Sequence, residues 1–223
     1  MTDSLLSCVE HELGAPVRAS VIWLHGLGAN GHDFEPILPL LDVDHLGIRF
    51  VFPHAPEIPV TLNGGFVMPA WYDILGMELD SRQDEAGIQR SGKQVTRLIE
   101  REVERGVPPE RIVLAGFSQG GAIALHLGLR YPEKLAAVIA LSTYLVRADK
   151  LESERSQANQ STPVFAAHGT QDPMVVYPRG VHARDTLQAL DYDVEWKEYP
   201  MQHQVCEPEI DAIGAYLRRV LEG

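Results

Sequence analysis

Residues 111–120, RIVLAGFSQG, join a short apolar run to a serine that has a glycine two positions before it and another two positions after it. The apolar run indicates a buried strand, and the small residues of 120–130 predict a helix. A Gly-x-Ser-x-Gly pattern between a strand and a helix is typical of a nucleophile elbow, a strained turn that presents a serine hydroxyl above a sheet. We therefore expect Ser118 to be a nucleophile. The alternative is a tight strand-to-helix turn in which the serine only caps the helix.

The alternation of strand and helix continues on both sides of this stretch. Near-continuous apolar segments predict strands, and segments with apolar residues at helical spacing predict helices. We expect strands at 17–24, 48–52, 111–115, 137–142, 163–167 and 194–199, an antiparallel edge strand at 5–9, and helices within 30–41 and at 81–105, 120–130, 177–190 and 207–221. This order predicts one α/β domain over residues 1–223, with a mostly parallel sheet between two helical layers. In such sheets, ligands bind at the carboxyl ends of the strands.

Residues 53–79 interrupt the alternation with a long loop-like insertion. It contains four prolines and a Gly-Gly pair, yet it is rich in apolar side chains. A long loop inside a compact domain is usually functional, and this one leaves a predicted strand at the carboxyl edge of the sheet. We expect Met68, Trp71 and Leu75 to line a substrate groove there, the alternative being that they belong to the ordinary core.

The composition excludes several classes of protein. Lys and Arg number 19 against 31 Asp and Glu, and this net charge of -12 argues against binding nucleic acid or anionic membrane surfaces. No apolar run approaches the ~20 residues that cross a bilayer, and the amino terminus lacks the pattern of a signal peptide. The two cysteines, Cys8 and Cys206, make no disulfide framework. We expect a cytoplasmic protein with no integral membrane association and no nucleic-acid partner.

A nucleophilic serine needs a base, and the base needs an acid that orients it. For a serine at a nucleophile elbow, the acid and then the histidine follow along the chain. His203 and Asp172 each follow a predicted strand, so we expect them to be base and acid. His182 falls within a predicted helix, and Asp149 follows no strand. His168 precedes Asp172 and is expected to support its loop by hydrogen bonding.

An oxyanion hole needs two hydrogen-bond donors. The backbone N–H of Gln119, directly after the nucleophile, is one candidate, and Leu27 in the loop 25–28 is the other. A plain turn is the alternative for that loop. No His or Cys cluster has the spacing of metal ligands, so no metal is expected. We expect Cys206 to be an inert buried thiol, because the elbow already supplies a nucleophile.

Several motifs resemble the phospholipase/carboxylesterase family, which includes acyl-protein thioesterases, lysophospholipases and small bacterial carboxylesterases. They are LHGLG at 24–28, PHAP at 53–56, PVTLN at 59–63, MPAWYDI at 68–74, GFSQGG at 116–121, HG at 168–169 and DP at 172–173. The resemblance implies the α/β-hydrolase fold and a serine hydrolase without a cofactor. It maps the family's triad onto Ser118, Asp172 and His203, and its oxyanion donors onto Leu27 and Gln119.

The sequence departs from the family pattern beside the base, where Gln202 and Gln204 stand in place of the common Gly and Ser. Bulkier neighbours of His203 can alter the loop or the acyl groove. The resemblance also leaves the substrate open.

The leading hypothesis is an esterase that cleaves carboxylic esters or thioesters through an acyl-enzyme intermediate. Small-molecule esters, lipid esters such as lysophospholipids, and acylated proteins are its open substrate classes. The alternatives are an acyl-binding or scaffold protein without turnover, and a serine peptidase on the same fold. The complete Ser, Asp and His set argues against a binding protein. A monomer and a homodimer both remain open.

Overall fold

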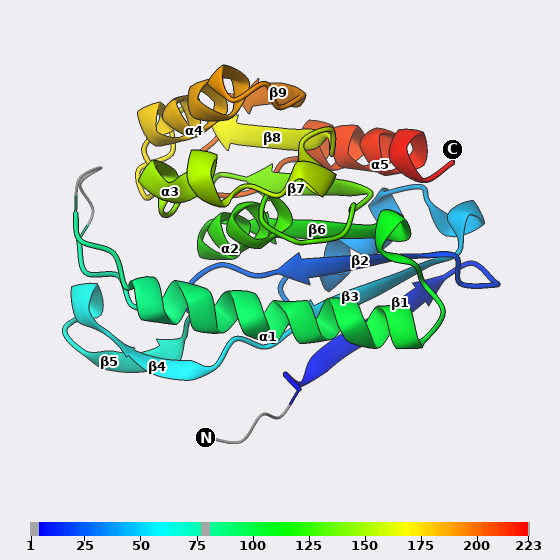
Figure 1. Ribbon diagram of the computed structural model, residues 1–223, viewed down its shortest axis with the longest axis horizontal. Helices are drawn as coiled ribbons and strands as arrows, with labels where there is room; N and C mark the ends of the chain where they lie inside the picture. Colours follow the sequence, from blue (N-terminus) through cyan, green and yellow to red (C-terminus); the bar gives the residue numbers. More distant parts are fainter. Residues whose placement is uncertain (1–4, 77–80, 223) are drawn as a thin grey trace.

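The computed structural model describes residues 5–76 and 81–222, which fold around a seven-stranded sheet (Figure 1). The strands lie in the order β1-β3-β2-β6-β7-β8-β9. They span Cys8–Leu13 (β1), Ile48–Pro53 (β3), Ala19–Leu24 (β2), Ile112–Phe117 (β6), Ala137–Leu141 (β7), Val164–Gly169 (β8) and Val194–Tyr199 (β9). Neighbouring strands are parallel, except that β1 runs antiparallel to β3. The strand order reverses between β2 and β6, so the loops after these two strands border the crevice where α/β sheets bind ligands.

Helices cover both faces of this sheet. One face packs against α1 (Glu85–Glu104), α2 (Gln119–Gly128), α3 (Ala148–Glu154) and α4 (Tyr177–Ala189), and the other against α5 (Glu207–Leu221). In β2, Ile22 and Leu24 enter the first core, while Val21 and Trp23 enter the second. This division follows from the two-residue period of a strand, which turns successive side chains to opposite faces. The predicted three-layer α/β/α arrangement is confirmed.

The helix expected within 30–41 is not an α-helix. The chain forms only the short 3-10 helix η1 (Glu35–Leu40) there. Pro39 lies inside the segment, where it lacks an N–H donor and its ring obstructs the carbonyl four residues earlier. Ile37 and Leu38 of this 3-10 helix are buried. Other 3-10 turns are η2 (Asp44–Leu46), η4 (Pro109–Arg111) and η5 (Gln157–Asn159).

Two element boundaries differ from the expectation for local reasons. The long helix α1 begins at Glu85 rather than at Ser81, because the Asp84 side chain caps it and accepts from the Gly87 N–H at 2.9 Å. The antiparallel edge strand occupies Cys8–Leu13 rather than 5–9, paired with the whole of β3 from Pro53 to Ile48.

The insertion 53–79 contains a β-hairpin that the sequence did not predict. Strands β4 (Glu57–Val60) and β5 (Phe66–Pro69) pair antiparallel, joined by the 3-10 turn η3 (Thr61–Asn63). Gly64 and Gly65 close the turn at φ of 68° and 80°, backbone values that glycine adopts at little cost. The end of the insertion, 77–79, lies outside the described residues.

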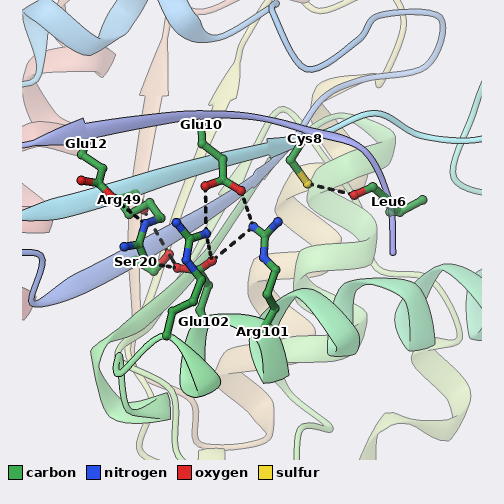
Figure 2. A network of polar contacts seen from close by, with 9 residues as sticks. Leu6, Cys8, Glu10, Glu12, Ser20, Arg49, Arg101 and Glu102 are labelled. Carbon is green, nitrogen blue, oxygen red and sulfur yellow. Dashed lines mark hydrogen bonds and ion pairs between the residues drawn. The ribbon is translucent and has the colours of Figure 1, made fainter. Parts of the chain in front are cut away.

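A buried ion cluster fixes the edge of the sheet to α1 (Figure 2). The Glu102 carboxylate, fully buried, accepts from Arg49 at 2.8 Å and from Arg105 at 2.9 Å, and also from Arg101 and Ser20. Glu10 of β1 binds Arg101 and Arg105, each at 2.8 Å. The cluster therefore ties β1 and β3 to the carboxyl-terminal turns of α1. Across the described part of the chain, no helix has both the length and the apolar character needed to cross a bilayer.

Candidate active site

Ser118 stands in a strained turn between β6 and α2, as the Gly-x-Ser-x-Gly pattern predicted. Its backbone has φ 54° and ψ -122°, outside the regions that non-glycine residues favour. A Cβ on Gly120 would lie 2.3 Å from the Leu24 carbonyl oxygen, and one on Gly116 would lie 2.4 Å from the Gly120 backbone. The flanking glycines are thus required by close backbone approach. The turn presents the Ser118 side chain at the carboxyl end of β6.

Three side chains predicted from the sequence meet at this point. His203 Nε2 lies 2.9 Å from Ser118 Oγ, and His203 Nδ1 lies 2.6 Å from Asp172 Oδ2. Asp172 follows β8, and His203 follows β9, so the sheet itself brings the three strand ends together. Chain order, together with a position directly after a predicted strand, therefore selected the acid and the histidine that the fold places beside Ser118.

The Asp172 carboxylate is buried, and both of its oxygens accept hydrogen bonds. Oδ1 accepts the N–H groups of Met174 at 2.8 Å and Val175 at 2.9 Å, which leaves Oδ2 facing His203. His168 Nε2 donates to the Val175 carbonyl at 2.7 Å, and burial lowers the pKa of His168. The loop-supporting role expected for His168 is therefore confirmed. The His203 ring also packs against another aromatic ring, that of Phe117, with centroids 4.6 Å apart.

Leu27 and Gln119 border the same cleft as Ser118 and His203. The loop that carries Leu27 is fixed from the insertion: the Trp71 indole donates to the His25 carbonyl at 2.8 Å, and the Gly28 N–H donates to the Pro69 carbonyl at 2.8 Å. His25 Nε2 accepts from the Ala55 N–H at 3.1 Å, and burial lowers the pKa of His25. The loop 25–28 is thus held by three hydrogen bonds, two of them buried.

The Gln119 side chain binds the backbone of the insertion. Its Oε1 accepts from the Trp71 N–H at 2.8 Å, and its Nε2 donates to the Tyr72 carbonyl at 2.7 Å. One residue therefore borders the nucleophile with its backbone and holds the insertion with its side chain. The sequence identified the backbone position and missed the tether.

The cleft beside Ser118 has a volume of about 240 Å³. Its lining is Gly26, Leu27, Ala29, Asp33, Leu62, Asn63, Ile74, Phe117, Ser118, Gln119, Tyr144, Met174, Val175, Arg179 and His203. The insertion contributes Leu62 and Ile74 to this lining, and the loop after Asp172 contributes Met174 and Val175. This composition suits an apolar chain attached to a carbonyl at Ser118.

The expected groove residues need correction. Trp71 is completely buried in the core, where its backbone N–H binds Gln119 Oε1 and its indole N–H binds the His25 carbonyl. Met68 lies beside Asn63, outside the cleft lining, and Leu75 lines a neighbouring cavity instead. Two other apolar residues of the insertion, Leu62 and Ile74, line the cleft instead.

The rejected candidates lie elsewhere. His182 is on α4 and borders the neighbouring cavity, and Asp149 is in α3, a short helix that the sequence did not predict. Cys206 is a half-buried free thiol that precedes α5. Within residues 5–76 and 81–222, no group of three or more His, Cys, Asp or Glu side chains could hold a metal ion.

Comparison with known proteins gives a consistent result. The sequence profile of the phospholipase/carboxylesterase family matches residues 9–221. Acyl-protein thioesterase 1 of Neurospora crassa is 42% identical over 213 residues, covering 89% of this chain and 85% of the relative. Acyl-protein thioesterase 1 of Gibberella zeae is 40% identical, covering 91% of each chain.

Solved structures show the same similarity in three dimensions. Arabidopsis thaliana SOBER1 superposes with a TM-score of 0.86 at 32% identity, covering 92% of this chain and 100% of that one. Zea mays acyl-protein thioesterase 2 gives a TM-score of 0.87 at 28% identity, covering 96% and 99%.

Proposed function

The chain belongs to the phospholipase/carboxylesterase family of α/β-hydrolases, and from that membership we propose that it hydrolyses carboxylic esters and thioesters through an acyl-enzyme formed on Ser118. One observation carries the proposal: a continuous hydrogen-bonded line from Ser118 Oγ through the His203 ring to Asp172 Oδ2, at 2.9 and 2.6 Å. This arrangement is the one that activates a serine hydroxyl, which is otherwise a weak nucleophile.

In the acylation step, His203 Nε2 accepts the proton of Ser118 Oγ as the oxygen attacks the carbonyl carbon. Asp172 Oδ2 accepts from His203 Nδ1–H and stabilises the imidazolium that forms. The backbone N–H groups of Leu27 and Gln119 are the proposed donors to the oxyanion. The tetrahedral intermediate then expels the alcohol or thiol, which takes its proton from His203, and the acyl group stays on Ser118.

Deacylation repeats the sequence with water as the nucleophile. His203 removes a proton from the water, the water oxygen attacks the acyl carbonyl, and Ser118 leaves with the returned proton. The free carboxylic acid is released, and the resting hydrogen bonds are restored.

The proposed substrates are acyl esters or thioesters whose acyl part is apolar. The carbon-rich cleft supports this class, and the relatives named acyl-protein thioesterases support an acylated protein or a lipid as the natural donor. A cytoplasmic location, and a monomeric or homodimeric state, stay predictions from the sequence.

The test is a panel of substrates on the purified full chain: p-nitrophenyl esters from acetate to decanoate, an acyl thioester, a lysophospholipid and a peptide anilide. We expect turnover of esters and thioesters with no measurable cleavage of the anilide. Cleavage of the anilide at a comparable rate would make the protein a peptidase. Tight acyl binding with no turnover of any substrate would make it a binding protein.

A further inference from the structure

Tyr144 borders both the catalytic cleft and a second, larger cavity. Tyr144 and Arg179 line the cleft of about 240 Å³ that contains Ser118, and both also line a cavity of about 640 Å³. Two consecutive residues of the insertion are split between these cavities: Ile74 lines the cleft and Leu75 lines the larger cavity. The side chains of Tyr144 and Arg179 therefore form a wall with a hollow on each side.

This wall is held rigidly. The Tyr144 hydroxyl lies 2.7 Å from the Tyr72 hydroxyl, and the Tyr72 carbonyl accepts from the Gln119 side chain at 2.7 Å. The Arg179 guanidinium lies over the Tyr144 ring, 3.9 Å from its centroid, as in a cation–π contact. The ring is thus fixed at its tip and on its face, so it cannot swing aside without breaking both contacts.

The segment that carries Tyr144 is hydrogen-bonded to the backbone of the nucleophile. The Ser118 N–H donates to the Leu141 carbonyl at 2.9 Å, and the Thr143 hydroxyl donates to the Ser118 carbonyl at 2.6 Å. Tyr144 follows directly. Because Tyr144 borders both hollows, an acyl chain that runs from Ser118 toward the larger cavity has to pass its ring.

We propose that Tyr144 is a specificity-determining residue that closes the end of the acyl cleft and so restricts hydrolysis to short and medium acyl chains. The proposal rests on the ester hydrolysis proposed above and names its acyl-length preference. Each further methylene that finds apolar cover improves binding by about fourfold, so kcat/KM rises with chain length until the ring is reached. Beyond that length, added methylenes find no cover in the cleft.

The test compares kcat/KM for p-nitrophenyl butyrate, octanoate, laurate and palmitate, each below its aggregation limit. In the wild type we expect a maximum near octanoate. The larger cavity is lined mainly by polar and charged side chains, so any new apolar cover in Tyr144→Ala comes from the space that the ring vacates. That space admits two or more further methylenes, so the laurate-to-butyrate ratio of the variant should rise by about tenfold or more. Tyr144→Phe keeps the ring and loses only the hydroxyl, so it should keep the wild-type ratio.

A laurate-to-butyrate ratio in folded Tyr144→Ala within about twofold of the wild type would overturn the proposal. Tyr144→Val, a smaller truncation checked by circular dichroism, serves if the alanine variant unfolds. The wild type alone is also decisive, since palmitate turnover as fast as octanoate turnover would show that no wall limits the chain. Failure to hydrolyse any ester would instead reject the proposed function itself.

Discussion

At Ser118 the backbone holds a φ of 54°, a conformation that costs a non-glycine residue on the order of 1–3 kcal/mol. The turn is held in that conformation by the flanking glycines, by the strands parallel to β6, and by the hydrogen bond from the Thr143 hydroxyl. The strain is localised at the residue that must project from the sheet. A serine fixed in this way reaches His203 without further rearrangement.

Asp172 provides the sharpest single-residue test of the proposed mechanism. In Asp172→Asn the side chain no longer offers a carboxylate to His203 Nδ1–H, so the imidazole loses its orientation and its countercharge. We expect kcat to fall by on the order of 10⁴-fold with little change in fold. Asp149→Asn, on the exposed surface of α3, is the matched control. A loss below about tenfold in Asp172→Asn would exclude the acid role.

Glu209 predicts a pH dependence of stability. This carboxyl is fully buried in the first turn of α5, and burial raises its pKa from 4.5 to about 8. Between these values the unfolded chain releases a proton that the folded chain keeps, so Glu209 makes the protein less stable as the pH rises through this window.

Glu209→Gln removes this titration. The free energy of unfolding of the variant, relative to wild type, should increase by on the order of 3 kcal/mol between about pH 5 and about pH 8. Urea denaturation at the two pH values measures it. An equal difference between variant and wild type at both pH values would show that Glu209 does not titrate in this range.

At the scale of the elements, the Glu102 cluster should control how β1 and β3 attach to α1. Glu102→Ala leaves Arg49, Arg101 and Arg105 without their shared buried carboxylate, and we expect a loss of about 3–5 kcal/mol in the free energy of unfolding. Glu12→Ala removes only a half-exposed partner of Arg49 and should cost less than about 1 kcal/mol. Comparable losses of unfolding free energy in both variants would mean that the buried Glu102 carboxylate contributes no more to stability than the half-exposed Glu12.

The insertion yields a matched pair of neighbouring residues. Ile74 lines the cleft, whereas Leu75 lines the cavity beyond the Tyr144 wall. Ile74→Asp should lower kcat/KM for the octanoate ester far more than for the acetate ester, because acetate does not reach that side chain. Leu75→Asp should change the octanoate-to-acetate ratio little. If Leu75→Asp has the larger selective effect, the acyl chain lies on the other side of the wall.

For the whole molecule, the features that could be predicted share one cause. Parallel strands end at one edge, so the residues that follow them in sequence, Ser118, Asp172 and His203, meet in space. Continuous apolar runs located those strands because both faces of the sheet are covered. Chain order excluded His168 as the base, and the position after a predicted strand separated His203 and Asp172 from His182 and Asp149.

The features that could not be predicted depend on contacts between segments distant in sequence. Apolar character in the insertion is shared by core, cleft and cavity residues, and only packing decides that Trp71 is buried while Ile74 lines the cleft. Tyr144 lies soon after the end of β7, and Met174 lies soon after Asp172. Both positions are at the carboxyl edge of the sheet, which could have indicated these two residues as part of the cleft lining. The proline in η1 was visible in the sequence, and it explains why helical spacing did not produce an α-helix.

The acyl-enzyme is the most direct test of the molecule's proposed chemistry. The wild type is mixed with p-nitrophenyl octanoate, quenched in acid during turnover, and digested for peptide mass spectrometry. We predict an octanoyl mass increment on Ser118 that is absent from Ser118→Ala, together with a loss of about 10⁴-fold or more in kcat for that variant. An acyl group found on another residue such as Cys206, or near wild-type turnover by Ser118→Ala, would contradict the assignment of Ser118 as the nucleophile.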